Sequence, residues 1–255
     1  MNTKERILKI LLKNTEQYIS GQRLANDLKI SRNSIWKAIN RLKKEGYNII
    51  GSPKNGYLLT VKQDVINVSE ITKNLNFDND YEIEFINEVQ STNNYARELL
   101  CKNEYLSNYV IIANYQRSLL AHNKKIVFTP EDTGLYFTII LNQDEFSNYD
   151  ILSNKVLSLL AETLNKFSNK KVTIKDNYIY INGRKVASTI SEVTYSLEYS
   201  KILNVILGIN INLYKPKNGF PIDILNEQTY IFENNIHNLK NEILIYFLEN
   251  LYKKV

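Results

Sequence analysis

Three short segments at the start of the chain repeat apolar residues at the spacing of an α-helix. The first runs from about Lys4 to Lys13, the second begins at Ser20, and the third extends from Ser31 to Gly46. Serine accepts hydrogen bonds from the free backbone amides that begin a helix, and glycine commonly ends one. Only Lys29 and Ile30 separate the second segment from the third, so the two helices must cross at a tight turn. The pattern predicts a helix-turn-helix.

The third segment has one apolar face and one polar face. Ile35, Ile39 and Leu42 recur at helical spacing and form an inward stripe. Trp36 lies at the edge of this stripe, where we expect it to pack. The opposite face carries hydrogen-bond donors and cations but no acid, whereas a merely solvated face usually mixes both signs of charge, so it suits a helix inserted between phosphates. Its members are Asn33, Lys37, Asn40, Arg41 and Lys44.

A short hairpin is predicted after the third segment. Residues Tyr47–Leu59 hold two β-prone runs joined by Gly-Ser-Pro-Lys-Asn-Gly, and a hairpin after a helix-turn-helix is typical of a wing. Lys54 and Asn55 lie at its tip, where they can touch a groove or a phosphate backbone. The sequence therefore predicts a winged helix-turn-helix domain over residues 1–62 that binds DNA. The candidate contacts are Ser31, Arg32, Asn33, Lys37, Asn40, Arg41, Lys44, Lys54 and Asn55.

The remainder of the chain alternates strands with helices. Alternating apolar residues predict a strand over Tyr81–Val89, and the run Ser91-Thr92-Asn93 begins the helix after it. Strands dominate, which indicates an α+β domain over residues 65–255, with a mixed, largely antiparallel sheet and helices against one face. The other predicted elements are strands near Tyr109–Asn114, Gly134–Leu141, Val172–Ile174, Tyr178–Ile181, Lys185–Val193 and Ile202–Asn212, and a helix near Ile151–Phe167.

Charge is spread unevenly between the two predicted domains. Residues 1–62 hold 13 of the 32 Lys and Arg residues and four of the 27 acids, a balance of +9. The rest of the chain carries 19 basic and 23 acidic residues, a balance of −4. This asymmetry is typical of a nucleic-acid-binding head on a body that does not bind nucleic acid.

Composition excludes several classes of protein. No uninterrupted apolar run approaches the roughly 18 to 20 residues that a membrane span needs, and the charged N-terminus lacks the apolar core of a signal peptide. We therefore expect a cytoplasmic protein without a membrane segment. The single cysteine, Cys101, excludes an internal disulfide framework. With only His122 and His237 beside it, no His/Cys metal cluster is expected.

Several short motifs occur here in the same order as in a known family. In the head they are ISGQRLANDLKISRNSIWKAINRLKKEGYNI and GYLL. In the body they are STNNYA, NYQ, TGLYFTIIL, YIYINGRKVAS and LGININ. Each fragment is weak alone, but the ordered set, from about residue 5 to residue 250, is specific. By these motifs the chain resembles the bifunctional biotin protein ligases that double as biotin operon repressors.

The resemblance implies an activity and a ligand site. The family joins biotin to ATP as biotinyl-AMP, transfers biotin to a lysine of a carrier protein, and represses transcription as an adenylate-bound homodimer. A small polar set matches the family positions that lie against the biotin ring and its carboxylate. Ser91 could also serve only as a helix cap, and Gln116 and Asn212 could only satisfy strand ends. The candidate ligand-binding set is Ser91, Thr92, Asn93, Gln116, Lys175 and Asn212.

The phosphate-binding loop departs furthest from the pattern of the family. That loop, GRGRxGR, encloses phosphate with backbone amides and guanidiniums. Counted on from Gln116, it falls on Leu119-Leu120-Ala121-His122-Asn123-Lys124-Lys125, in which every glycine and arginine is replaced. Leucine supplies neither charge nor backbone freedom. We therefore do not expect ATP to bind.

Three further positions are altered. The lysine of the family's KWPND motif corresponds to Lys175 or has shifted by one residue. Glycines of the AGI and GIGIN motifs are replaced by Ser188 and Asn210, whose side chains should fill or reshape the pocket. The chain also stops after NEILIYFLENLYKKV, so the small SH3-like C-terminal domain of the family is expected to be absent.

These departures predict a regulator and no catalytic residue. The expected protein is a homodimeric, DNA-binding repressor on an inverted-repeat operator, with an eroded ligase domain that senses biotin or a related metabolite and needs no cofactor. One alternative is an active, divergent ligase in which Lys124, Lys125 and Lys175 replace the lost arginines and support formation of biotinyl-AMP. Another is a ligand-free DNA-binding dimer whose body is only a scaffold.

Overall fold

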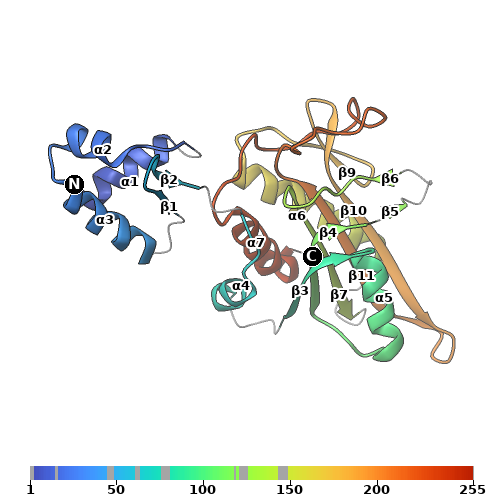
Figure 1. Cartoon of the computed structure of the whole chain (residues 1–255). Helices are drawn as coiled ribbons and strands as arrows, with labels where there is room; N and C mark the ends of the chain where they lie inside the picture. The colour runs from blue at the N-terminus through green and yellow to red at the C-terminus, as the bar shows by residue number, and fades with distance from the viewer. Residues whose placement is uncertain are drawn as a thin grey trace. The chain divides into compact units, whose positions relative to one another are not determined.

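A computed structural model of the chain describes residues 3–14, 17–44, 49–60, 64–75, 81–117, 119–120, 126–142 and 149–254. The chain divides into two compact units, Met1–Gln63 and Asp64–Val255. Figure 1 shows the elements of each unit in colour order along the chain. No helix in the described residues is long and apolar enough to cross a membrane.

The first unit begins with three helices, α1 (Thr3–Lys13), α2 (Gly21–Leu28) and α3 (Arg32–Lys44). One apolar cluster joins them, because the residues repeated at helical spacing turn toward the same centre. The predicted helix-turn-helix is confirmed. The fully buried members of the cluster include Ile7, Leu11, Leu24, Ile35, Ile39 and Leu42.

Local hydrogen bonds fix both ends of α2 and the beginning of α3. Ser20 Oγ accepts a hydrogen bond from the backbone amide of Arg23 at 3.0 Å, which confirms the predicted N-cap. At the other end of α2, Lys29 takes the left-handed conformation with φ 54°, and Ser31 Oγ accepts from the amide of Ser34 at 3.1 Å. Each hydroxyl satisfies an amide that has no partner inside its own helix.

The wing is an antiparallel pair formed by β1 (Ile49–Ser52) and β2 (Gly56–Leu59). Its second strand is tied to the loop before α2, because Tyr57 and Ile19 exchange two backbone hydrogen bonds of 2.8 and 2.9 Å. Gly56 permits this close approach: its φ is 98°, and a Cβ at this position would lie 2.2 Å from the carbonyl oxygen of Ile19. The turn end of the hairpin, where Ser52 pairs with Gly56, is therefore tied to the loop before α2.

A seven-stranded sheet forms the centre of the second unit, in the order β3-β4-β7-β11-β10-β9-β8. Only β3 and β4 are parallel, so the prediction of a mixed, largely antiparallel sheet is confirmed. A separate two-stranded ladder pairs β5 (Leu119–Leu120) with β6 (Ile126–Val127). The strands of the main sheet are β3 (Glu82–Val89), β4 (Tyr109–Gln116), β7 (Gly134–Asn142), β8 (Thr173–Lys175), β9 (Tyr178–Ile181), β10 (Arg184–Ser196) and β11 (Lys201–Asn212).

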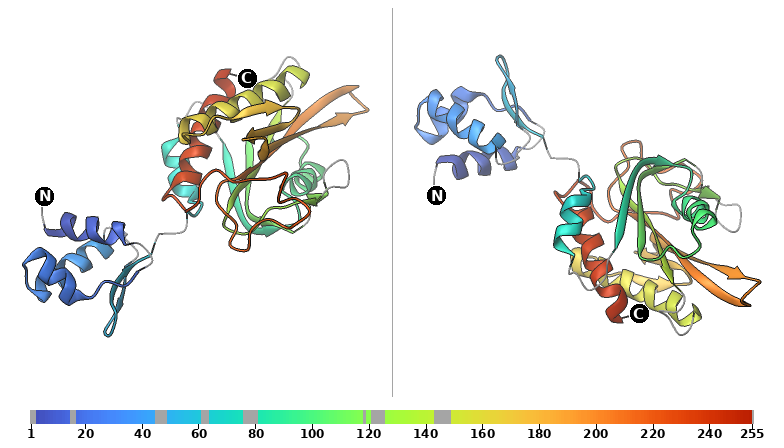
Figure 2. Two further views of the ribbon diagram at one scale, coloured as in Figure 1. Left: turned by 90° about the horizontal axis from the view of Figure 1, so that it is seen from above. Right: turned by 90° about the horizontal axis from the view of Figure 1, so that it is seen from below.

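Helices cover both faces of this sheet, as the two views of Figure 2 show. Phe137 and Ile139 of β7 belong to the large cluster under α6 and α7, whereas Ile140 packs with Ala96 and Leu100 of α5. The prediction of helices against one face is therefore wrong. The sequence signal for a sheet covered on both faces is the largely apolar run of β7, which does not alternate with polar residues. Eight successive residues of this strand are buried, as a strand covered on both sides requires. The helices are α4 (Val68–Asn74), α6 (Tyr149–Phe167) and α7 (Leu239–Lys254) on one face and α5 (Thr92–Lys102) on the other.

Trp36 does not pack into the head as the sequence predicted. Its side chain is 55% exposed, whereas Ile35 and Ile39 are buried. Trp36 lies one residue, about 100° of helical rotation, beyond Ile35, and this step takes it outside the buried arc. The indole therefore belongs to the outer face of α3.

Candidate functional site

The beginning of α5 and the end of β4 bring together four of the predicted ligand residues. Ser91 is the N-cap of α5 and accepts a hydrogen bond from the amide of Asn94 at 3.4 Å. Thr92 and Asn93 begin the helix, and Gln116 ends the strand. All four predicted residues, Ser91, Thr92, Asn93 and Gln116, are buried. Chain segments more than twenty residues apart thus form one polar cluster under α5.

The side chain of Gln116 has hydrogen-bond partners at both ends of its amide. Its oxygen accepts from the backbone amide of Thr92 at 2.9 Å and from the Thr92 hydroxyl at 3.2 Å. Its nitrogen donates to the side-chain oxygen of Asn210 at 2.9 Å. The backbone carbonyl of Gln116 separately accepts from the Thr129 hydroxyl at 3.0 Å. The amide oxygen thus has two donors from Thr92, and the amide nitrogen gives one of its two hydrogens to Asn210, a bond that must break before a ligand acceptor can take the place of the Asn210 oxygen.

Thr138, a residue that sequence reasoning missed, lies at the centre of the cluster. It is fully buried, and its hydroxyl donates to Asn93 Oδ1 at 2.7 Å and lies 2.7 Å from the Thr92 hydroxyl. Gly208 on the neighbouring strand leaves room for Asn93, since a Cβ there would lie 2.2 Å from Asn93 Oδ1. The available signal was Thr138 itself, because a polar residue within an otherwise apolar buried strand requires a buried partner.

Glu192 and Arg97 add charge beside this cluster and were also missed. Asn93 Nδ2 donates to Glu192 Oε1 at 2.8 Å. Arg97, one turn into α5, pairs with the other carboxylate oxygen of Glu192 and also donates to Asn94. Glu192 lies at an even spacing from Ser188 along β10, so strand alternation places both on the α5 face of the sheet.

The two positions where the family has glycine adjoin each other in the sheet. Asn210 on β11 is directly opposite Ser188 on β10 and Tyr136 on β7, so the three side chains share the α5 face. Tyr136 is fully buried and donates from its hydroxyl to the carbonyl of Pro130 at 3.1 Å, and burial raises its pKa above the ordinary range. These three residues form a row across β10, β11 and β7, and their side chains occupy the α5 face of the sheet at that level.

Lys175 and Asn212 lie apart from the Gln116 cluster. Lys175 is exposed at the end of β8; its register partner Tyr178 pairs with Ser188, so Lys175 shares the row but lies three strands from Asn210. Adjacent strands are about 4.8 Å apart, which leaves Lys175 out of hydrogen-bond range of Gln116. Asn212 donates to Gln228 Oε1 at 3.2 Å.

Lys185 supplies a cation that sequence reasoning passed over. Its ammonium lies 4.2 Å from the centroid of the Tyr178 ring, a cation–π distance. Its backbone is held by hydrogen bonds with Glu227 and Thr229, at 2.7 and 2.8 Å. The available sequence signal was the position of Lys185 at the beginning of the second strand of a hairpin, three residues after the turn residue Asn182.

The segment that matches the family's phosphate loop, residues 119–125, is described only at its start. Leu119 and Leu120 form β5, and residues 121–125, with His122, Lys124 and Lys125, lie outside the described residues. Before β5, Arg117 forms an ion pair with Glu88 at 2.5 Å. This contact lowers the pKa of the Glu88 carboxyl and raises that of Arg117. The guanidinium of Arg117 is therefore paired with a carboxylate on β3, the strand next to β4.

The nucleic-acid face predicted on α3 is present as an exposed surface. Helix α3 contains no acidic residue, and within the described residues Arg32, Lys37 and Arg41 form no ion pair. Asn40 is half-buried, and the Lys44 side chain lies outside what the structure describes. The exposed candidates are Ser31, Arg32, Asn33, Lys37 and Arg41 on α3 and its cap, with Lys54 and Asn55 at the wing tip.

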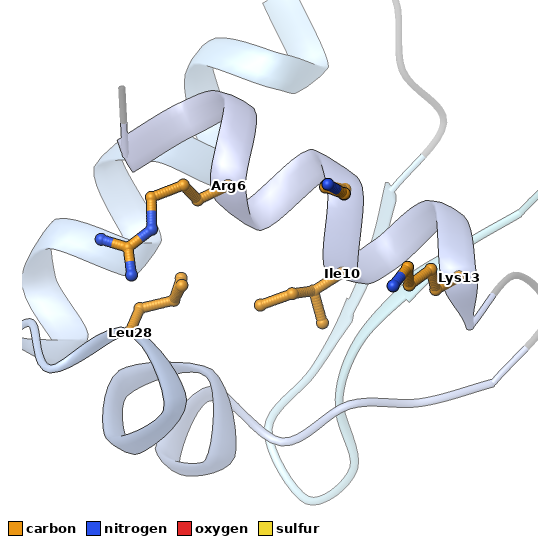
Figure 3. A pocket seen from close by; sticks show the side chains of 5 residues that line it. Arg6, Ile10, Lys13 and Leu28 are labelled. Atoms are coloured by element: carbon orange, nitrogen blue, oxygen red, sulfur yellow. The ribbon is translucent and has the colours of Figure 1, made fainter. Parts of the chain in front are cut away.

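A hollow of about 320 Å³ lies between α1 and α2 (Figure 3). Arg6, Lys9 and Lys13 line it together with the aliphatic side chains of Ile10 and Leu28. The three cations are exposed and add to the positive charge of the head. Among the described residues, no group of three or more His, Cys, Asp or Glu side chains could hold a metal ion.

The fold and the site define a class of protein, a winged helix-turn-helix unit followed by an α+β unit with a buried polar cluster. The helix-turn-helix (HTH) domain model matches residues 3–58, and the model of the biotin/lipoate A/B protein ligase family matches residues 85–212. The chain belongs to the biotin/lipoate A/B protein ligase family. The resemblance inferred from the ordered motifs is confirmed.

Among curated proteins, the chain is 27% identical over 214 residues to "Bifunctional ligase/repressor BirA" of Bacillus subtilis, covering 82% of this chain and 64% of that protein. It is 27% identical over 205 residues to the protein of the same name from Escherichia coli, covering 80% and 61%. The chain thus spans less than two thirds of the length of either relative.

Solved structures show the same fold. A biotin protein ligase from Aquifex aeolicus in complex with biotin and ATP has a TM-score of 0.54 and 23% identity, over 68% of this chain and 69% of that one. A biotin acetyl coenzyme A carboxylase synthetase from Helicobacter pylori has a TM-score of 0.53 and 16% identity, over 69% and 75%. At these identities the likeness shows the fold alone.

Proposed function

We propose that the chain is a cytoplasmic transcriptional regulator that binds DNA through its head and senses biotin or a related metabolite through a ligase-like domain without ligase activity. The observation that carries this proposal is the hydrogen bond between Gln116 and Asn210. A side chain at a glycine position of the family takes the amide group that a ligand would otherwise meet. The proteins named "Bifunctional ligase/repressor BirA" motivate the link between a ligase-type domain and repression.

The head contacts operator DNA with α3 in the major groove and the wing beside it. An acid-free helix whose cations Arg32, Lys37 and Arg41 form no ion pair in the part of the chain that the structure describes supports this role, because each phosphate contact releases counterions from the duplex. The regulator acts as a homodimer, and two-fold symmetry then requires an inverted-repeat site. The contacting set is Ser31, Arg32, Asn33, Lys37, Asn40, Arg41, Lys44, Lys54 and Asn55.

The effector binds under α5, where its polar groups replace hydrogen bonds between the side chains of the cluster, such as the one from Gln116 to Asn210. The proposed contacts are Ser91, Thr92, Asn93 and Gln116, together with Asn212, two residues along β11 from Asn210. Lys175, three strands from Asn210 in the same row, is proposed to contact only the far end of a long ligand. A ligand that replaces the Asn210 oxygen on Gln116 must carry a carbonyl or another acceptor, as the ureido group of biotin does. No cofactor is required for this step, and ATP is not needed.

A second candidate is an active ligase that forms biotinyl-AMP. Lys185 favours it, since its ammonium lies at Tyr178, in the same sheet row as Ser188 and Asn210. A lysine can neutralise a phosphate as a point charge in place of arginine. Transfer of biotin in the presence of ATP separates the two candidates.

Isothermal titration of the full chain with biotin, without ATP, tests the proposed effector. We expect binding in the micromolar range or tighter, and no heat at millimolar biotin would overturn biotin sensing. Incubation with ATP, biotin and a biotin carrier domain tests the loss of catalysis, with an active ligase as the positive control for the carrier. Any transfer above the enzyme-free reaction would establish the second candidate instead.

A further inference from the structure

Trp36 is a large apolar side chain placed on the outer face of the helix that carries the cations. It is the only tryptophan of the chain, and 55% of its surface is exposed. Within the described residues its indole makes no hydrogen bond and no ring contact. No hydrogen bond or ring contact in the described residues therefore accounts for an indole at this position, and more than half of it faces solvent. Its exposed indole leaves apolar area in contact with water, which a partner surface would relieve.

The neighbours of Trp36 on the helix surface are hydrogen-bond donors and cations. Residues three and four positions apart are adjacent on a helix, so Asn33 and Arg32 lie before the indole and Asn40 lies after it. Lys43 lies one further turn along the same side. Arg32, Asn33 and Lys43 are exposed, and Asn40 is half-buried. The indole thus has cationic or amide neighbours on both sides.

A partner for this surface must offer anions and an apolar group within one helix width. An acidic protein surface or a lipid headgroup layer supplies the charge without a recurrent apolar group at fixed depth. The major groove of DNA supplies both, because phosphates line its edges and the C5-methyl group of thymine projects from its floor. The wing beside α3 also suits a duplex.

We propose that Trp36 is a specificity-determining residue that packs against a thymine methyl group in the major groove, while cations around it hold the phosphates. The inference rests on the proposed function of the head as a DNA-binding domain. It assigns sequence reading in part to an apolar contact. Asn33 and Asn40 are placed to read the base edges next to the thymine.

Intrinsic fluorescence gives a direct first test, since excitation at 295 nm selects the single tryptophan over the 18 tyrosines. Duplexes selected by the full chain from a random-sequence pool serve as the probe. Because the free indole is exposed, its emission should shift to shorter wavelength or be quenched when a selected duplex binds. Emission that is unchanged by a bound duplex would overturn the inference.

Replacement of each thymine of a selected duplex by deoxyuridine gives the second test, because the exchange removes only the C5-methyl group. Loss of one buried methyl group should weaken binding of the natural chain about fourfold at one position in each half-site. With Trp36→Ala the same exchange should have no effect. A Trp36→Phe variant keeps an apolar ring and should retain part of the discrimination.

The outcomes are separable. If the natural chain binds no duplex, the proposed function of the head fails and the inference fails with it. If the chain binds DNA but no deoxyuridine exchange affects it, or Trp36→Ala weakens selected and random duplexes equally, the DNA-binding head stands and the role of Trp36 is wrong. A far-ultraviolet circular dichroism spectrum like that of the natural chain shows that each variant is folded.

Discussion

Gln116 and Asn210 lie 94 residues apart in the chain, and their side-chain amides form a hydrogen bond of 2.9 Å under α5. The contact exists because β11 places Asn210 opposite Tyr136 while β4 ends beside the beginning of α5. In the proposed function, this amide oxygen of the protein occupies the position that a ligand acceptor would take. Exchange of that oxygen for an effector is the central event in the proposed mechanism.

Removal of the Asn210 side chain should raise the affinity for biotin. Asn210→Gly frees the Gln116 amide nitrogen, and a recovered hydrogen bond strengthens binding roughly five- to tenfold. Asn204→Gly is the matched control: Asn204 is buried on the same strand and face, but it bonds to Thr194 instead of Gln116. Isothermal titration of both variants checks this, and equal affinities for Asn210→Gly and the natural chain would contradict it.

Thr138→Val should destabilise the second unit and abolish effector binding. The substitution keeps the volume but removes the hydroxyl that donates to Asn93 Oδ1, and an unsatisfied buried acceptor costs about 1–3 kcal/mol. Thr163→Val is the control, because Thr163 is equally buried but its hydroxyl bonds to Leu159 of its own helix. Urea unfolding and biotin titration should separate the variants, whereas equal losses would argue against a special role for Thr138.

Lys37→Ala should change the salt dependence of DNA binding. One lost phosphate contact lowers the slope of log affinity against log salt concentration by about 1. Lys73→Ala, an exposed lysine of α4 in the second unit, removes the same charge away from α3 and should leave the slope unchanged. Fluorescence-anisotropy titrations from 50 to roughly 200 mM salt give both slopes. Equal slopes for Lys37→Ala and the natural chain would remove Lys37 from the interface.

Asp64 should make the second unit less stable as the pH rises. Burial raises its pKa above the ordinary value of 3.8, although hydrogen bonds from the Tyr214 hydroxyl at 2.6 Å and the Lys240 amide at 2.9 Å oppose the shift. The charges of Lys240 and His237 oppose it as well. The folded chain therefore holds this proton more tightly than the unfolded chain. The stabilisation is present below the ordinary pKa and is lost as the pH rises through the higher folded value.

Asp64→Asn keeps both acceptor contacts and removes the titration, so its free energy of unfolding should fall less than that of the natural chain over this range. Urea unfolding at a series of pH values from about 4 upward measures the difference. Glu88→Gln is a control of opposite sign, because the Arg117 bond lowers the pKa of Glu88. Parallel curves for Asp64→Asn and the natural chain would show that Asp64 contributes nothing to the pH dependence.

The sequence by itself determined the local elements, because caps and periodicity act within one or two turns of chain. The N-cap at Ser20, the stripe of Ile35 and Ile39, and the strand from Tyr178 to Ile181 all follow from neighbouring residues. The ordered motifs were sufficient to identify the family. The same motifs pointed to Gln116 and to Asn210, although their contact was not foreseen.

Only the tertiary structure decided which side chains meet. The register of β7, β11 and β10 aligns Tyr136, Asn210 and Ser188, and this register depends on pairing between strands that are distant in the chain. The position of α5 on the second face of the sheet also depends on contacts between distant segments, since Ala96 and Leu100 pack against Ile140 and Ile206 of the central strands. Trp36 was misread because helical periodicity gives an angle but no boundary to the buried arc, and only packed neighbours set that boundary.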